Sequence, residues 1–234
     1  MKNLLILLAS LLLPIVCFSQ TKTEGVIVDI DGNVYHTVTI GDQMWLKENL
    51  KVTKYNNGDP IVLVTDTIAW TKLKTPAYCN YNNNEAIAQE YGRMYNYYVV
   101  VDDRKVCPTG THVPTDLEWE MLCNFLGGKM VAGGKLKESG TEHWNSPNVM
   151  AINTRNGDYS EISPSESGFN ALPAGRQYHS CYTFLGLYTE LWSTTPCEYD
   201  TDLVWCRYLT FSLPHFCRFT YKKHYGLSIR CIKD

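Results

Sequence analysis

Nine cysteines are the residues of this 234-residue chain that are best suited to chemistry. Thiols form disulfides, bind soft metals or act as nucleophiles. None of them forms a CxxC pair or keeps zinc-ligand spacing with a histidine, so the sequence predicts no structural metal site. Cys17 lies in an apolar N-terminal segment, and eight cysteines follow it: Cys79, Cys107, Cys123, Cys181, Cys197, Cys206, Cys217 and Cys231.

Other catalytic patterns are missing from the sequence. It has no GxSxG elbow and no HExxH zinc helix, and its six histidines are scattered. Glu118 and Glu120 are two residues apart on an expected helix, so they point in different directions and do not form an acid pair. We therefore predict a protein that is not an enzyme, with no catalytic residue and no cofactor. The net charge of -3 and the absence of a basic run argue against nucleic acid as a partner.

The first twenty residues, MKNLLILLASLLLPIVCFSQ, are typical of a secretory signal peptide. We expect a signal peptide over 1–19 with cleavage before Gln20, and a secreted or cell-surface protein. Lipid anchoring through Cys17 is the alternative, which the bulky Val16 before it disfavours. No later apolar run is long enough for a transmembrane segment. Residues 20–234 are then one domain, with an even cysteine count that favours disulfides in an oxidising compartment.

The segments after the signal peptide predict short strands and two helices. An N-terminal hairpin is expected over 25–41, with Asp31 and Gly32 in a tight type I′ turn. The same DIDGN segment resembles half of a calcium loop, but the rest of that loop is missing, which favours the turn. A short helix over Glu85 to Tyr91 ends at Gly92, and an aromatic strand follows near 94–101.

A helix after Pro114 is the best-specified element of the sequence. Thr115 is the expected N-cap, and Glu118 completes a capping box. Gly127 and Gly128 end the helix. Its apolar residues cover a wide arc, which predicts burial against more than one layer. The residues of this arc are Leu117, Trp119, Met121, Leu122, Phe125 and Leu126.

The second half of the chain combines a long irregular region with short strands. Residues 133–168 are rich in Gly, Ser, Asn and Pro, which predicts a functional or disordered loop. Four apolar runs then read as strands of an antiparallel sheet: FNALPAG, LWSTT, LVWCRYLTF and GLSIRCI. The expected fold class is α+β.

Several blocks, in order, resemble the Fibrobacter succinogenes major paralogous domain family. The blocks include DIDGNVYHTVTIGDQMWLKENLKVTKYNNGDPI, YGRMYNYYVV, CPTGTHVPTDLEWEMLCNFLGG, AGGKLKESGTEHWNSPN, SGFNALPAGR, LWSTT and GLSIRCIKD. The resemblance covers nearly the whole chain after the signal peptide. It implies an exported protein, common in Bacteroidetes-like bacteria, with a C-type-lectin-like fold similar to that of the formylglycine-generating enzymes. That fold has a small twisted antiparallel sheet, one or two helices and long irregular loops. No known activity is implied.

The resemblance also suggests a disulfide between Cys107 and Cys231. Cys123 is a rival partner for Cys231, because lectin-like domains often join a helix to the last strand. Cys206 and Cys217 flank FSLPHF and could join the two strands of a hairpin.

The expected function is recognition of an extracellular glycan or protein ligand by a lectin-like surface. The candidate binding residues are aromatic: Trp144, Tyr178, Tyr182, Trp192 and Trp205. Each has an ordinary alternative role in the core. The carboxylate motifs of calcium-dependent lectins are missing, so no metal is expected. The alternative function is a copper and thiol oxidase like the formylglycine-generating enzymes, which would use Cys206 and Cys217.

Overall fold

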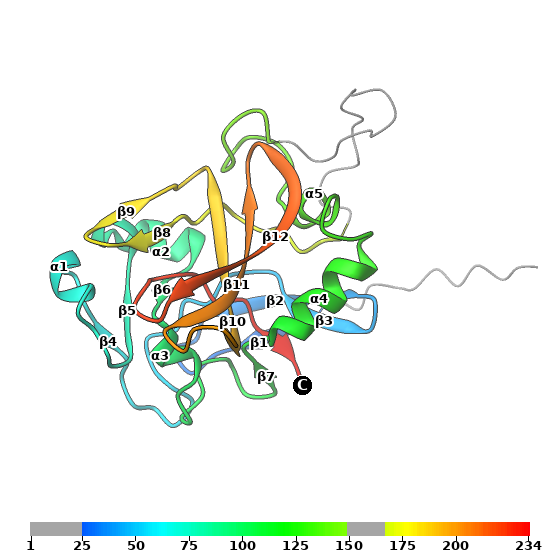
Figure 1. Cartoon of the computed structure of the whole chain (residues 1–234). Coiled ribbons are helices and arrows are strands. Elements are labelled where there is room, and N and C mark those ends of the chain that lie inside the picture. The colour runs from blue at the N-terminus through cyan, green and yellow to red at the C-terminus, as the bar shows by residue number, and fades with distance from the viewer. Residues whose placement is uncertain (1–24, 149–166) are drawn as a thin grey trace, which may run out of the picture.

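The computed structural model describes residues 25–148 and 167–234. This part of the chain is a mixed α+β structure in which short, mostly antiparallel strands predominate (Figure 1). Within it, no helix has the length and apolar character needed to cross a membrane. The predicted signal peptide, Cys17 and half of the predicted loop over 133–168 lie outside the described residues.

Five short helices and thirteen strands make up the described chain. The helices are α1 (Thr67–Trp70), α2 (Glu85–Tyr91), α3 (Tyr97–Val100), α4 (Asp116–Phe125) and α5 (Ala132–Leu136), with a 3-10 turn η1 over Tyr81–Asn83. The strands are β1 (Val26–Val28), β2 (Val34–Ile40), β3 (Gln43–Leu46), β4 (Val62–Leu63), β5 (Ala77–Cys79), β6 (Met94–Tyr95), β7 (Thr111–His112), β8 (Arg176–Tyr178), β9 (Cys181–Thr183), β10 (Tyr188–Pro196), β11 (Leu203–Thr210), β12 (Leu213–Lys222) and β13 (Ile232–Lys233).

The predicted N-terminal hairpin is present, with a longer turn than expected. Val28 pairs with Val34, so five residues connect β1 and β2 and not a two-residue type I′ turn. The Asp29 carboxylate explains the difference, because it accepts hydrogen bonds from the backbone N–H groups of Asp31 and Asn33. It also accepts the hydroxyl of Tyr35, at 2.7 Å. The oxygen-rich DIDGN segment therefore uses Asp29 to hold its own turn.

The two ends of the described chain meet in one sheet of order β1-β2-β3-β13-β7. Ile232 of β13 pairs with Trp45 of β3 on one side and with His112 of β7 on the other. The disulfide between Cys107 and Cys231 joins the segments that precede β7 and β13. This bond confirms the pairing that the resemblance suggested and removes Cys123 as the partner of Cys231.

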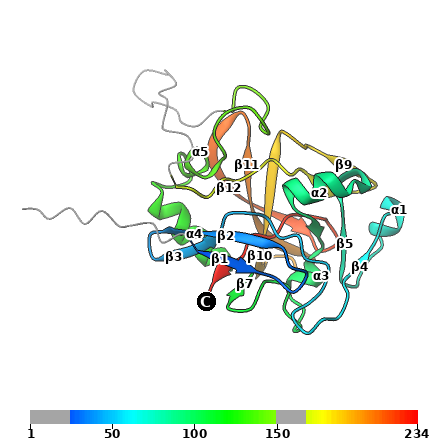
Figure 2. The same cartoon turned by 180° about the vertical axis from the view of Figure 1, so that it is seen from behind.

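The longest strands form the antiparallel sheet β10-β11-β12, which stands beside α4 and α5 (Figure 2). One face of this sheet packs on α4 through Leu191, Leu209 and Phe216, which share a core cluster with Trp119. Trp119 also stacks on Trp45 of the first sheet, with ring centroids 4.5 Å apart. Helix α4 therefore links the two sheets through one buried aromatic side chain.

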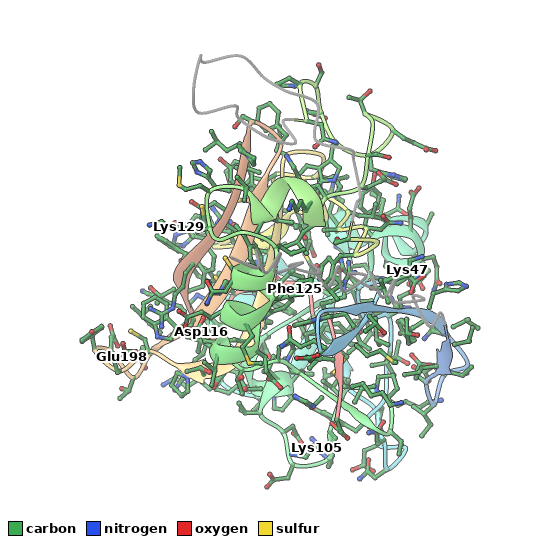
Figure 3. All side chains as sticks on the ribbon, turned by 90° about the vertical axis from the view of Figure 1, so that its right-hand side faces the viewer. Lys47, Lys105, Asp116, Phe125, Lys129 and Glu198 are labelled. Atoms are coloured by element: carbon green, nitrogen blue, oxygen red, sulfur yellow. A yellow bond between two sulfur atoms is a disulfide. The ribbon has the colours of Figure 1, made fainter. Side chains whose placement is uncertain are left out.

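Helix α4 has the predicted start but a narrower buried face than predicted. Thr115 and Glu118 form the capping box, with the Glu118 carboxylate 2.7 Å from the Thr115 backbone nitrogen. Leu117, Met121 and Phe125 are 65%, 50% and 64% exposed, so the expected burial of the whole apolar arc was wrong. Figure 3 shows Asp116 and Phe125 at the two ends of α4. Only one side of the helix is covered, because the sheets lie on that side alone.

Three other predicted segments differ from the structure. The strand expected near 94–101 is a two-residue strand, β6, followed by helix α3. The aromatic and β-branched residues of α3 favour strands, but here they form a helix whose side chains pack into the core. Tertiary packing therefore overrides their strand propensity. Residues 169–175 form isolated bridges and no strand. Helix α5 occupies the start of the expected irregular region.

The helix over Glu85 to Tyr91 is confirmed as α2 and ends at Gly92.

Candidate functional site

The face of β10-β11-β12 that is turned away from α4 carries an unusual concentration of aromatic side chains. Alternate residues of a strand point to the same face of a sheet, so Tyr188 and Glu190 of β10 lie on one face and Leu191 on the other. In the same way Phe219 and Tyr221 of β12 share a face, and Phe216 lies on the opposite one. The site therefore follows directly from the two-residue period of these strands.

These side chains line a pocket of ≈ 230 Å³, called the aromatic pocket below. Its lining combines five aromatic residues with one cation and one carboxylate. The lining residues are Arg176, Phe184, Tyr188, Glu190, Tyr208, Phe219 and Tyr221. They come from three strands of the sheet and from the β8-β9 hairpin beside it, which is visible in yellow in Figure 1.

The aromatic side chains make a continuous series of ring contacts around the pocket. Phe184 lies 4.9 Å from Tyr188, and Tyr188 lies 6.2 Å from Tyr208, measured between ring centroids. Tyr208 lies 6.4 Å from Phe219, which lies 5.2 Å from Tyr221. These separations are within or near the range of favourable aromatic pairs. The rings thus support one another and need no ligand to hold them in place.

Arg176 closes this series of contacts. Its guanidinium carbon lies 5.1 Å from the centroid of the Tyr221 ring and 4.9 Å from that of Phe184, which are distances typical of cation–π contacts. Gly175 allows the close approach of β8 that places it there. A Cβ atom at Gly175 would lie 2.4 Å from the carbonyl oxygen of Thr183, and its φ of +66° also favours glycine.

Glu190 lies at the floor of the aromatic pocket and is almost fully buried. Its Oε1 accepts a hydrogen bond from Arg176 at 2.7 Å and another from the hydroxyl of Tyr221 at 2.8 Å. Arg176 also donates to the Tyr221 hydroxyl. The other carboxylate oxygen of Glu190 and the Nε of Arg176 have no hydrogen-bond partner among the described residues. The floor therefore keeps one acceptor and one donor unsatisfied.

Burial changes the acid–base behaviour of this floor. Desolvation raises the pKa of Glu190 to about 7, because it outweighs the opposing effects of Arg176 and Tyr221. The pKa of Tyr221 is raised by burial and by the neighbouring Glu190 charge. The Tyr221 hydroxyl therefore stays protonated near neutral pH and acts as a donor. The pocket offers hydrogen bonding and stacking, and its one carboxylate is already engaged by Arg176 and Tyr221.

The aromatic residues predicted from the sequence have different positions. Trp144 and Trp192 are buried, and their indole N–H groups donate to the carbonyl oxygens of Ala171 and Tyr95. Both rings are shielded from solvent, so neither is placed at the surface where a ligand was expected. Both tryptophans can be buried in the core because an indole has one N–H group and needs only one internal acceptor.

The other three predicted residues are partly exposed. Trp205 lies on the α4 side of the sheet and donates to Glu198, with the Arg218 guanidinium carbon 3.2 Å from its ring centroid. The Tyr182 hydroxyl donates to Asn83. Of the three, Tyr178 lies next to the aromatic pocket, because the guanidinium carbon of Arg176 is 4.6 Å from the centroid of its ring.

Cys206 and Cys217 are not bonded to each other. In the β11-β12 ladder Cys206 is opposite Phe219 and Cys217 is opposite Tyr208, so the two thiols are displaced along the strands. Burial raises the pKa of Cys206 well above its ordinary value, which keeps it a thiol and not a thiolate. Among the described residues no group of three or more His, Cys, Asp or Glu is placed to hold a metal. The residues therefore do not fit the copper site of the oxidase alternative.

The expectation that most cysteines are bridged was also wrong for the described chain. Only Cys107 and Cys231 are paired there. The unpaired cysteines are Cys79, Cys123, Cys181, Cys197, Cys206 and Cys217. Four of these six are buried and act as small apolar residues.

Two histidines are held between pairs of carboxylates. His112 contacts Asp234 and Glu118 at 2.6 and 2.9 Å, one through each ring nitrogen. His143 contacts Glu138 and Glu90 in the same manner, at 2.8 and 2.9 Å. For both, burial lowers the pKa but the carboxylate hydrogen bonds outweigh it and raise it. With both nitrogens engaged, these rings are better suited to tying segments together than to transferring protons.

Comparison with known proteins gives one match. The model of the Fibrobacter succinogenes major domain family, Fib_succ_major, matches residues 38–233. The chain belongs to this family. No curated protein and no solved structure matches it. The match spans β2 to β13 and so includes every residue of the aromatic pocket of this Fib_succ_major domain.

Sequence reasoning missed this pocket, although a signal was present. The pattern Tyr188-x-Glu190 in one strand and Phe219-x-Tyr221 in another places polar and aromatic groups on one face. The contributions of Arg176 and Phe184 depend on the tertiary packing of β8 and β9 and are not visible in the sequence.

Proposed function

We propose that this chain is an exported, non-catalytic recognition module with a C-type-lectin-like fold, and that it binds an extracellular glycan or protein ligand in the aromatic pocket. One observation carries the proposal: a closed series of aromatic contacts surrounds a buried Arg176–Glu190 pair on a sheet face that is only partly covered. Pockets with mainly aromatic walls and a few directed polar groups are the usual form of a binding site.

Exposure supports a binding role over a purely structural one. Phe219 is 50% exposed and Phe184 is 37% exposed, so both rings offer apolar surface to solvent at the rim of the pocket. Leaving such rings exposed forgoes the free energy that burial would provide, about 25 cal/mol per Å². A ligand that covers them would recover it.

Features away from the pocket support the fold and the absence of catalysis. The N-terminal and C-terminal strands share one sheet, and a disulfide ties the approach to α4 to the last strand, as the family resemblance implies. His112 and His143 are each fixed by two carboxylates. The predicted signal peptide supports export to the cell surface or medium.

A glycan and surface-protein array tests the proposal. The mature chain should bind at least one class of ligand, and Phe219→Ala should reduce that binding about tenfold. Leu117→Ala is the matched control, because Leu117 is an exposed apolar residue on α4, behind the opposite face of the sheet. Equal losses for both variants, or no loss for Phe219→Ala, would contradict the proposed site.

A further inference from the structure

The charges of the aromatic pocket limit the kind of ligand that it can take. Arg176 and Glu190 form an ion pair at 2.7 Å, so the ionised floor is close to neutral. A cationic ligand would meet the Arg176 guanidinium, which already occupies the faces of Phe184 and Tyr221. An anionic ligand would meet the carboxylate of Glu190. Because Arg176 and Glu190 already compensate each other's charge, an ionic ligand would find no free counter-charge in the ionised pocket, so the pocket favours a neutral ligand.

The polar groups that line the pocket favour a ligand that both donates and accepts hydrogen bonds. The lining includes the Arg176 guanidinium and the side chains of Tyr188, Tyr208 and Tyr221. A guanidinium only donates, whereas a tyrosine hydroxyl donates or accepts. A ligand hydroxyl is donor and acceptor at once, so it suits both kinds of group. A purely apolar ligand would form none of these hydrogen bonds.

The walls and size of the pocket select the remainder of the ligand. The rings of Phe184 and Phe219 are partly exposed at the rim and offer apolar surface suited to C–H groups. The cavity of ≈ 230 Å³ is smaller than the roughly 300 Å³ at which sites for drug-sized molecules begin. One ring of six or so heavy atoms with its substituents is therefore the appropriate size, and a chain of rings would extend into solvent.

We propose that the aromatic pocket binds a single neutral sugar ring, with its C–H face on the aromatic rim and its hydroxyls directed to the Arg176–Glu190 floor. This inference rests on the proposed recognition function and specifies its ligand. Binding does not use calcium, because the pocket has one carboxylate and no second acid to complete an oxygen cage. Glycans of which only one terminal or side residue fits the pocket are the expected natural form.

Ligand-observed NMR with the full mature chain tests the inference, since it detects weak binding. The probes are methyl β-glucopyranoside, methyl β-galactopyranoside and methyl α-mannopyranoside, each with and without EDTA. Competing classes are represented by tetramethylammonium for cations, acetate for anions and p-cresol for a tyrosine side chain of a protein partner. We expect saturation transfer to at least one methyl glycoside, strongest at its ring C–H protons, unchanged by EDTA, and a Kd of the order of 1 mM.

Variants separate the pocket from the rest of the surface. Phe219→Ala should weaken glycoside binding about tenfold and Glu190→Gln should weaken it by a similar factor, whereas Leu117→Ala should leave it unchanged. Tyr208→Phe keeps the ring and provides a second variant that should fold. Tighter binding of tetramethylammonium or acetate than of every glycoside would overturn the inference.

Failure of the inference can be told apart from failure of the proposed function. Binding of p-cresol or of an array protein that depends on Phe219, with no glycoside bound, would overturn the sugar assignment and leave the recognition site in place. Glycoside binding that persists in Phe219→Ala and Glu190→Gln would overturn both, because the ligand would then bind elsewhere.

Discussion

The guanidinium of Arg176 lies 2.7 Å from the buried carboxylate of Glu190, beneath a series of aromatic rings. The pair comes from β8 and β10, two strands of different sheets. A parallel bridge between Gly175 and Thr189 brings these strands together next to the pair. The site thus depends on the packing of the β8-β9 hairpin against the three-stranded sheet.

The first prediction concerns pH. The pKa of Glu190 is raised to about 7 by burial, whereas an unfolded glutamate has a pKa of about 4.3. The folded state therefore binds more protons between these values, so this group makes the free energy of unfolding fall as pH rises from about 4.5 to 7. The total change in the free energy of unfolding is up to about 4 kcal/mol. Urea unfolding across this range should show the fall, and Glu190→Gln should flatten it.

Glu120→Gln is the control for this pH dependence, because Glu120 is exposed on α4. It should leave the slope of stability against pH unchanged. Parallel pH dependences of the wild-type protein and Glu190→Gln would show that the pKa of Glu190 is not raised in the folded protein, and would contradict the prediction.

The second prediction concerns the start of α4. The buried Asp116 carboxylate accepts hydrogen bonds from Arg207 and Arg218, both at 2.7 Å. Asp116→Asn removes the charge and leaves the buried Arg207 guanidinium without its counter-ion. Loss of one partner of a buried pair should lower the free energy of unfolding by about 3 kcal/mol. Chemical denaturation measures this, and a loss no larger than that of Glu120→Gln would contradict it.

The third prediction concerns the disulfide. The bond between Cys107 and Cys231 closes a loop with a sequence separation of 124 residues. Replacing both cysteines with serine should lower the free energy of unfolding by up to about 5 kcal/mol in the chain-entropy model. Cys181→Ser is the control, since Cys181 is exposed and unpaired. Thermal melts with and without reductant should show that only the wild-type protein and the control are sensitive to reduction.

The fourth prediction concerns the exposed face of α4. Leu117→Gln and Met121→Gln should each change the free energy of unfolding by no more than about 0.5 kcal/mol, because both side chains are at least half exposed. Trp119→Ala should cost about 3–5 kcal/mol, since its ring stacks on Trp45 in the core. Similar losses in the free energy of unfolding at all three positions would contradict this prediction. They would indicate that the whole apolar arc of α4 is buried, as the sequence predicted.

Local signals in the sequence predicted the ends of elements better than their faces. The capping box of Thr115 and Glu118, the end of α2 at Gly92 and the N-terminal hairpin each depend on residues close together in the chain, and the structure confirms them. The family and the Cys107–Cys231 bond were predicted from the resemblance.

Tertiary packing decided what the sequence could not show. Met121 and Trp119 are both apolar residues of α4, yet only Trp119 faces the sheets. Trp144 and Trp192 were candidates for binding because of their type, and the core takes both. The aromatic pocket combines residues from β8 to β12, so its assembly depends on strand order and register, which the separate segments do not specify.

The central claim is that the aromatic pocket is the ligand-binding surface. Its most direct test is protein-observed NMR of the ¹⁵N-labelled chain titrated with methyl β-glucopyranoside, methyl β-galactopyranoside and methyl α-mannopyranoside in turn. We expect amide shifts that saturate with ligand and cluster on β8, β10, β11 and β12 around Arg176 and Phe219. Shifts that cluster instead on α4 around Leu117 and Met121, with the pocket strands unchanged, would contradict it.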